Sequence, residues 1–328
     1  MAKGSNQKLK LSYLKKIMLE KTDDDHGLTM PQIIEELEKY EVTAERKSIY
    51  TDLEDLEKLG VEIIKEKNGR EHLYHVGGRL FELAEIKLII DTIQASKFIT
   101  ERKSRQLIEK LKSLVSKYEA QQLSRQIYVH GRIKTQNESI YYNVDYIHNA
   151  INNNKKIQFK YYKWDINKEL ILKNKGNAFV VSPWALTWDD ENYYMVAYDD
   201  FSGKIKHYRV DKMTGISVTE QSRDGKELFE NFDITSYSKK NFGMYGGVNK
   251  RICIEFPDYL CGVFIDRFGK DIEFREVDDS HHKFYVSVAI SPQFFGWIFS
   301  LGKEVKVTEP EDIVLEMKQY LADIAKNY

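Results

Sequence analysis

The sequence predicts a multidomain α+β protein whose helical and β-rich modules follow one another along the chain. Apolar residues recur at spacings of three and four through most of the first 125 residues, which is typical of amphipathic helices. Between residues 141 and 222, 15 of 82 positions are aromatic, against 12% in the whole chain, and the segment reads as short strands. From about residue 249, strand-like and helix-like runs alternate. A chain of 328 residues is long enough for several separate cores.

The composition is that of a soluble globular protein, with 42% hydrophobic residues, 31% charged residues and a mean hydropathy of −0.53. No run approaches the roughly 18 apolar residues that a membrane span needs. The N-terminal stretch MAKGSNQKLK lacks the apolar region of a secretion signal. We therefore expect a cytoplasmic protein without membrane contact. Cys253 and Cys261 have neither disulfide-scaffold density nor CxxC spacing, so we expect two ordinary buried thiols.

The first 78 residues predict three helices and a hairpin. Residues 9–21 place apolar side chains on one stripe, and a second helix is expected from the N-cap candidate Thr29 to about Tyr40, with a proline in its first turn. A third helix is expected to begin at Thr43 and to end before Gly60, a residue suited to the position after a helix. The Asn-Gly pair within 67–69 then predicts a β-hairpin.

Helix, helix, helix, hairpin is the order of a winged helix-turn-helix, which we assign to residues 1–78. If Ile49, Leu53 and Leu56 face the core, the opposite face of the third helix is free to meet DNA bases. Basic side chains on that face and on the hairpin suit bases and phosphates, and hydroxyl groups suit phosphates. The candidate DNA-binding residues are Thr43, Arg46, Lys47, Ser48, Tyr50, Lys65, Lys67 and Arg70.

The charge of this module leaves a second interpretation open. Residues 1–78 hold 13 lysines and arginines and 16 aspartates and glutamates, a net charge of −3, and the whole chain has a net charge of −1. Winged helices also dock proteins, so a non-catalytic interaction protein is the alternative. If the module binds DNA, few phosphate contacts per chain imply a homodimer that reads two half-sites.

The remaining modules follow from periodicity. Residues 79–138 predict a helical linker or dimerisation segment, with a polar break near Ile99 and Thr100. Residues 139–225 predict a helix followed by about five short strands, which suggests a small barrel. Residues 241–328 alternate in the β-α-β-β-α-β order of a ferredoxin-like domain, followed by a closing helix. The glycine-rich stretch at 241–247 suggests a hinge or tight connector.

Motifs for catalysis or metal binding are weak. Glu304-Val305-Lys306 has the ExK form of metal-dependent nucleases, and alternation would place both charges on one strand face. This pattern arises by chance in a chain so rich in charge, and the acidic candidates Asp278 and Asp279 lie in an expected turn. The turns at 278–282 and 23–26 read as solvated and lack ordered metal-ligand spacing. We expect no enzyme activity, no metal site and no cofactor.

The run SPWALTWDDENYYMVAYDDFSGKIKHYRVDKM, from Ser182 to Met213, resembles the WYL domain. The family's Trp-Tyr-Leu triplet stands here as Tyr193-Tyr194-Met195, and the closing Tyr208-Arg209-Val210-Asp211-Lys212-Met213 follows the family pattern. The N-terminal helices and the C-terminal module resemble the winged helix and the extension that accompany such domains. The resemblance implies a bacterial, usually homodimeric, ligand-responsive transcriptional regulator. Its Sm/SH3-like barrel would bind a nucleotide or nucleic-acid ligand.

An anionic ligand that carries a base needs hydrogen-bond donors for its phosphate and flat rings for its base. From the resemblance and from strand alternation, the candidate ligand-binding residues are Lys160, Ser182, Trp184, Tyr193, Tyr194, His207 and Arg209. Each has a structural alternative. Arg209 suits an ion pair with Asp211 or Asp199, the aromatic residues suit the core, and Lys160 suits a solvated face.

Overall fold

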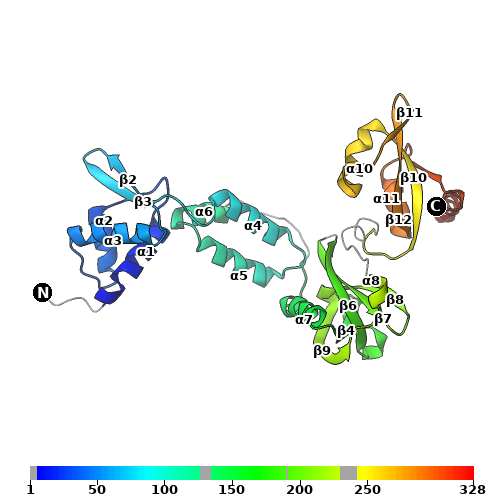
Figure 1. Cartoon of the computed structure of the whole chain (residues 1–328), viewed down its shortest axis with the longest axis horizontal. Helices are drawn as coiled ribbons and strands as arrows, with labels where there is room; N and C mark the ends of the chain where they lie inside the picture. The colour runs from blue at the N-terminus through cyan, green and yellow to red at the C-terminus, as the bar shows by residue number, and fades with distance from the viewer. Residues whose placement is uncertain (1–5, 126–133, 190, 230–241) are drawn as a thin grey trace. The chain divides into compact units, whose positions relative to one another are not determined.

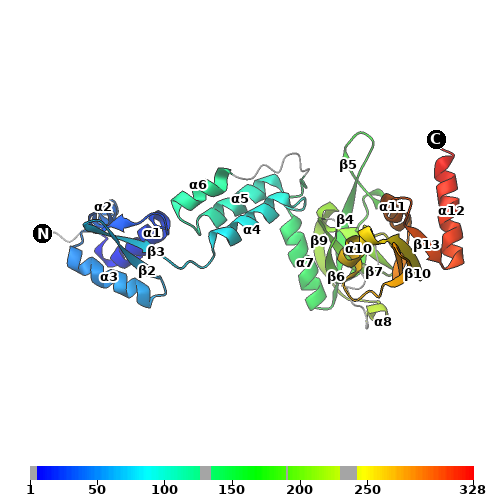
Figure 2. The same ribbon diagram turned by 90° about the horizontal axis from the view of Figure 1, so that it is seen from above.

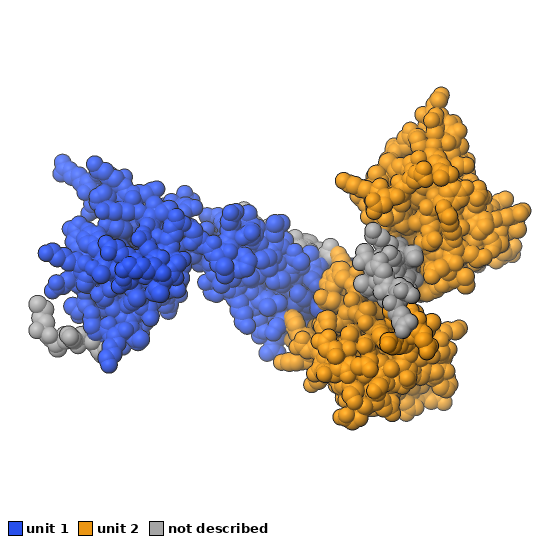
Figure 3. Space-filling model, viewed as in Figure 1, with its two compact units in different colours: residues 1–136 blue, residues 137–328 orange. Residues whose placement is uncertain are grey.

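The computed structural model describes residues 6–125, 134–189, 191–229 and 242–328. The chain divides into two compact units, residues 1–136 and 137–328, which Figure 3 colours separately. Both contain helices and strands, so the mixed α and β class expected from the sequence is confirmed (Figure 1). Among the described residues, no helix is long and apolar enough to cross a membrane.

The N-terminal part of the first unit contains three helices and a three-stranded sheet in the order β1-β3-β2. Its elements are η1 (Gln7–Leu9), α1 (Lys10–Lys21), β1 (Leu28–Thr29), α2 (Met30–Glu38), α3 (Arg46–Lys58), β2 (Ile63–Asn68) and β3 (Glu71–Val76). One core joins them, in which Leu14, Ile33 and Ile49 are fully buried. The element order is the one that the sequence predicts.

Local signals explain where these helices begin and end. The Thr29 hydroxyl accepts a hydrogen bond from the Gln32 backbone N–H, and the Gln32 side chain caps Thr29 in return. Helix α3 begins at Arg46 rather than at the expected Thr43, and its N-cap is Glu45, whose side chain makes no capping hydrogen bond. The prediction failed because residues 42–45 are not helical after the turn at Glu41, whose φ is 58°.

Helix α3 ends as predicted. Gly60 has a φ of 82°, and the Val61 N–H donates to the Leu56 carbonyl, which closes the C-terminus of the helix. The hairpin turn lies one residue later than the Asn-Gly pair suggests. Asn68 pairs with Glu71 at the end of the β2-β3 ladder, and Gly69 takes the left-handed conformation with a φ of 62°.

Three helices follow: α4 (Leu83–Ala95), α5 (Glu101–Lys112) and α6 (Lys117–Arg125). The sequence predicts the polar break before α5, where the Thr100 hydroxyl caps the helix. It does not separate α6 from α5, so the expected two-helix hairpin has a third helix in the structure. Ile86, Ile90 and Ile108 form the buried core of this group together with residues before and within α6.

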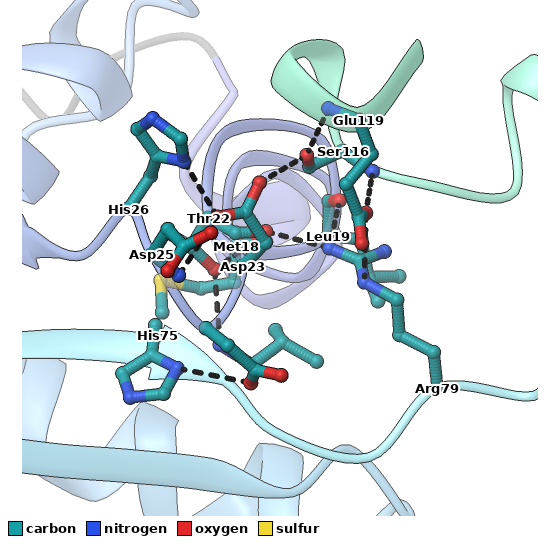
Figure 4. A network of polar contacts seen from close by, with 12 residues as sticks. Met18, Leu19, Thr22, Asp23, Asp25, His26, His75, Arg79, Ser116 and Glu119 are labelled. Carbon is teal, nitrogen blue, oxygen red and sulfur yellow. Dashed lines mark hydrogen bonds and ion pairs between the residues drawn. The ribbon is translucent and has the colours of Figure 1, made fainter. Parts of the chain in front are cut away.

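A buried polar network links α1 to the start of α6 (Figure 4). Asp23, expected in a solvated turn, is only 6% exposed. Its carboxylate accepts hydrogen bonds from the Ser116 hydroxyl and from His26 Nδ1, the latter at 2.6 Å. The His26 ring stacks on Tyr118 with centroids 3.7 Å apart. Arg79 donates to the carbonyls of Leu19 and Thr22 at the end of α1. The turn at 23–26 therefore forms part of a packed junction.

Replacing Asp23 by alanine should destabilise this junction by about 1.5–3 kcal/mol, the range for hydrogen bonds to a charged group. Burial raises the pKa of Asp23, but the hydrogen bonds from Ser116 and His26 outweigh burial and the net pKa lies below its ordinary value. The stabilisation is therefore present at neutral pH and is lost as the pH falls through the folded-state pKa. Hydrogen exchange of the α1 amides measures the effect. Asp25→Ala, at an exposed neighbour, is the control, and equal protection in both variants would contradict the assignment.

The second unit begins with α7 (Ile140–Asn152), which lies against β4, β6 and β9 of a curled sheet (Figure 2). The strands are β4 (Lys155–Trp164), β5 (Leu170–Leu172), β6 (Phe179–Asp189), β7 (Asn192–Asp199), β8 (Lys204–Arg209) and β9 (Met213–Ser222). Their order is β5-β4-β6-β7-β8, and β9 pairs with β4 on the edge opposite β6. The short turns η2 (Asn174–Gly176) and η3 (Val210–Lys212) connect strands, and α8 (Lys226–Phe229) follows β9. The sequence predicts every strand except the three-residue β5.

The C-terminal part has the predicted element order. Its elements are β10 (Val248–Pro257), η4 (Asp258–Leu260), α10 (Cys261–Phe268), β11 (Arg275–Asp278), β12 (His281–Ile290), α11 (Pro292–Ser300), β13 (Lys306–Glu309) and α12 (Glu311–Ala325). The sheet order is β11-β12-β10-β13, antiparallel throughout. Phe256, Phe264, Phe284 and Phe294 form the centre of its core. Phe242 and Met244 of the predicted connector are buried, and Phe242 packs on Phe294 with ring centroids 5.3 Å apart.

The structure also corrects the expectation for the ExK motif. Glu304 precedes β13, so it does not share a strand face with Lys306. Glu304 accepts a hydrogen bond from the Tyr259 hydroxyl, whereas Lys306 pairs with Glu255. Cys253 is buried as expected, but Cys261 is only half-buried at the start of α10. Both motif charges therefore have structural partners.

Candidate functional site

The exposed face of α3 carries two of the predicted DNA-binding cations. Ile49, Leu53 and Leu56 are buried, as the periodicity predicts. Arg46 and Lys47 lie in the first turn of the helix and are exposed. An exposed first turn with two cations is the arrangement that lets a helix present donors to an anionic partner.

Arg46 is held in place by Tyr50, which in turn contacts Tyr74. Its Nε donates to the Tyr50 hydroxyl at 3.1 Å, and its guanidinium lies 5.8 Å from the Tyr50 ring centre. The Tyr50 ring meets Tyr74 of β3 edge-on, with centroids 6.3 Å apart. Burial raises the pKa of Tyr74 to about 12, with a further contribution from the hydrogen bond to Tyr50. Tyr74, which sequence reasoning missed, therefore orients Tyr50 and through it Arg46.

Two other predicted residues of this region have different surroundings from those expected. Thr43 is exposed but lies outside the helix. The Ser48 hydroxyl accepts a hydrogen bond from Lys10 Nζ at 2.9 Å, and Lys10 also pairs with Asp52 at 2.5 Å. Lys10 joins α1 to α3 and was not singled out from the sequence.

The hairpin supplies three exposed cations, Lys65, Lys67 and Arg70. Lys65 Nζ lies 5.8 Å above the ring of Tyr74, so it belongs to the same cluster as Arg46 and Tyr50. The structure thus brings Arg46, Tyr50 and Lys65 together around Tyr74.

In the second unit, the ladder between β7 and β8 fixes which side chains share a face. Tyr194 pairs with Arg209, and Val196 pairs with His207. These residues lie on one face, as alternation predicts. On the other face, Tyr208 is buried, and its ring packs against Phe159, with ring centroids 5.2 Å apart. Tyr208 therefore belongs to the core.

Arg209 forms an ion pair with Asp211, which was one of the structural alternatives to ligand binding. Its guanidinium donates two hydrogen bonds to the Asp211 carboxylate, at 3.0 and 2.8 Å, and its side chain remains 33% exposed. The Tyr161 hydroxyl accepts from the Arg209 backbone N–H at 3.1 Å, and burial raises the pKa of Tyr161 to about 12. The exposed third of Arg209 can still contact a ligand, but the side chain is oriented by Asp211.

The other predicted ligand residues differ in burial. Burial lowers the pKa of His207, opposed by a hydrogen bond to the Met244 backbone, so the neutral imidazole is favoured. Tyr193 packs edge-on against Trp188 with centroids 4.8 Å apart. Tyr194 is half-buried beside Arg209, and Lys160 is exposed on β4.

Comparison with known proteins adds a family match. Residues 125–218 match the WYL domain. The matched segment contains α7 and the strands from β4 to β8. No curated protein matches the chain in sequence. A solved structure, proteasome accessory factor B/C (PafBC) of Arthrobacter aurescens, is 13% identical, with a TM-score of 0.27. The alignment covers 100% of this chain and 50% of that one, so the chain spans about half its length.

Within the segment that matches the WYL domain, Ser182 and Trp184 are not among the contacts of Arg209 and already have partners of their own. The Ser182 hydroxyl accepts from the Asp224 N–H at 2.9 Å. Trp184 Nε1 donates to the Asp224 carbonyl at 2.9 Å. The predicted ligand residues therefore fall into two groups, one around Arg209 and one beneath residue 224.

Among the residues that the structure describes, no group of three potential metal ligands comes together. The carboxylate of Asp278 instead accepts from Ser280 and contacts His281 Nδ1 at 3.0 Å. His282 contacts Asp258 at 2.7 Å. The contacts of Asp278 hold the turn between β11 and β12, and the contact between His282 and Asp258 joins β12 to η4.

Proposed function

We propose that the chain is a DNA-binding transcriptional regulator that responds to a ligand through its WYL domain. The observation that carries this proposal is the WYL match at 125–218 in a chain whose first 78 residues expose Arg46 and Lys47 on a helix turn. In this proposal residues 1–78 are a winged helix-turn-helix and residues 79–138 link it to the sensor. Residues 139–225 form the Sm/SH3-like ligand-sensing barrel, and 241–328 form a ferredoxin-like extension. The regulator has no catalytic role and acts in the cytoplasm.

The charge of the N-terminal module supports DNA binding by a dimer. With a net charge of −3 over residues 1–78, one copy has little general attraction for DNA. A dimer presents Arg46, Tyr50 and Lys65 twice, and both copies of the chain must contact the DNA for useful affinity. A ligand then changes DNA binding only if its affinity differs between two arrangements of the dimer.

DNase I footprinting on the DNA upstream of the chain's own operon tests this function. We expect two protected half-sites whose centres lie about 10 base pairs, or a multiple of this, apart. Protection that does not depend on sequence, or no protection at low salt, would contradict the regulator. The second outcome would favour the alternative, in which the N-terminal module docks a protein.

Arg209→Ala should remove the ligand response while the chain stays folded. Asp211, whose side chain is 12% exposed, loses its partner, so we expect a loss of about 1–3 kcal/mol in stability. Mass spectrometry of ligand carried by the purified protein, with a thermal melt, measures both effects. The Arg209→Ala/Asp211→Ala variant separates them, because it removes the unpaired carboxylate and should regain stability without regaining ligand. Ligand retention in both variants would exclude Arg209 from the binding site and leave the other predicted group, which contains Ser182 and Trp184.

A further inference from the structure

Residues 223–229, which we call the strap, lie against residues 182–184 of β6. Arg223 donates to the Pro183 carbonyl at 2.8 Å, and its guanidinium carbon lies 4.0 Å from the centre of the Trp184 ring. Asp224 contacts Ser182 and Trp184 through its backbone. At the end of the strap, the Phe229 ring stacks on Trp184, with centroids 4.9 Å apart and planes 8° apart.

The side chain of Asp224 meets a cation that belongs to the strands. Its carboxylate lies 2.6 Å from Lys156 Nζ. Ile157 pairs with Val181 in the ladder between β4 and β6, so Lys156 stands across from Ser182. Lys156 is only 9% exposed. A buried ammonium, a buried hydroxyl and an indole ring therefore lie next to one another on β4 and β6.

The strap makes with Lys156 and Trp184 the same kinds of contact that a nucleotide would make. The Asp224 carboxylate gives Lys156 a singly charged oxygen ligand, as a phosphate group would. The Phe229 ring covers the flat face of Trp184 in parallel, which is how a base stacks on an aromatic side chain. The same short segment supplies both groups.

We propose that the strap is an internal ligand mimic, and that a nucleotide displaces it from Lys156, Ser182 and Trp184. The proposal rests on the ligand-sensing function proposed above and deepens it: ligand binding is coupled to release of residues 223–229. The ligand's phosphate takes the place of the Asp224 carboxylate, and its base takes the place of the Phe229 ring.

The charges around Lys156 determine which kind of nucleotide phosphate is favoured there. Lys156 also contacts the carboxylate of Asp200, which stays when the strap leaves. A phosphodiester carries one negative charge, as Asp224 does, whereas a phosphomonoester carries close to two at neutral pH. Repulsion from Asp200 therefore favours a phosphodiester, in a cyclic mononucleotide or in a short single strand.

Gly225 offers a way to open the strap without changing any of the three binding groups. It has a φ of 82°, and a Cβ at this position would lie 2.5 Å from the Tyr198 ring. Gly225→Ala therefore strains the backbone and collides with Tyr198, which should displace the strap. Gly203→Ala is the matched control, since Gly203 has a φ of 63° but open space around a Cβ.

Isothermal titration calorimetry of the full chain with 3′,5′-cyclic AMP, the tetranucleotide (dT)4 and 5′-AMP tests the proposal. The apparent dissociation constant of a covered site is the intrinsic value divided by the open fraction, so opening the strap should tighten binding about tenfold or more. We expect this gain for cyclic AMP or (dT)4 in Gly225→Ala, a smaller gain for 5′-AMP and no change in Gly203→Ala. Phe229→Ala, which removes only the covering ring, should also tighten binding.

Adding Lys156→Gln to Gly225→Ala should abolish the gain. Equal affinities in wild type, Gly225→Ala and Phe229→Ala would overturn the proposal, as would the absence of heat with all three probes in both opened variants. If Gly225→Ala does not fold, Phe229→Ala decides alone. None of these titrations contains operator DNA, so a failure here is distinct from a failure of the footprint. Cyclic AMP binding without (dT)4 binding would assign the site to a mononucleotide, and the reverse to a strand.

Discussion

The Arg46→Ala/Lys47→Ala variant is expected to bind operator DNA about 100-fold or more weakly than the wild type. A good contact from Arg or Lys to a base is worth about 1–3 kcal/mol, and a homodimer makes each contact twice. Both side chains are exposed, so the variant should fold normally. Fluorescence anisotropy with a labelled operator fragment at fixed low salt measures the affinity, and circular dichroism checks the fold.

The control for this variant is Lys15→Ala/Lys16→Ala, an adjacent exposed pair on α1 with the same loss of charge. It should weaken binding far less, because a general loss of positive charge affects only screened attraction. Equal losses in the two variants would show that the first turn of α3 does not form the DNA-binding surface.

Phe159→Ala should destabilise the domain that contains residues 140–222 by about 3–5 kcal/mol, the usual cost of truncating a buried phenylalanine. Phe159 is fully buried, and its ring meets those of Phe179 and Tyr208, with centroids 5.7 and 5.2 Å away. The truncation leaves a cavity beside the rings of Phe179 and Tyr208, which the surrounding strands hold in place. Relaxation of these rings into the cavity should therefore recover little of the lost stability. Urea unfolding, followed by the fluorescence of the domain's tryptophans, measures the change.

Phe201→Ala is the matched control, because Phe201 lies fully exposed in the turn between β7 and β8. It should change stability by less than about 0.5 kcal/mol. A Phe159→Ala variant as stable as this control would mean that the aromatic cluster is not the core of the domain.

The features predicted correctly from the sequence are those set by local chemistry. Thr29 caps α2 because a hydroxyl before a helix can accept from the first free N–H groups. Gly60 ends α3 because it adopts a positive φ easily. Alternation placed Tyr194, His207 and Arg209 correctly, since the period of a strand is two residues.

The features that the sequence did not reveal depend on contacts between distant segments. The sequence predicts Asp23 as a solvated turn residue, but Asp23 is buried and accepts a hydrogen bond from Ser116, 93 positions away. The strand β5 has three residues, too few for a pattern, and forms because it pairs with the end of β4. Trp184 was expected to meet a ligand, and no local signal indicates that Phe229 covers it. Tyr74 was missed because its role depends on Tyr50 of another element.

The most direct measurement of the central claim is a salt titration of wild-type binding to DNA from upstream of its own operon. The account predicts specific binding at low salt. It also predicts that the logarithm of the binding constant falls linearly with the logarithm of salt concentration, by about 0.9 for each phosphate neutralised. The Arg46→Ala/Lys47→Ala variant should show weaker binding at every salt concentration. Absence of binding at low salt by the wild type and the variant alike would contradict the account.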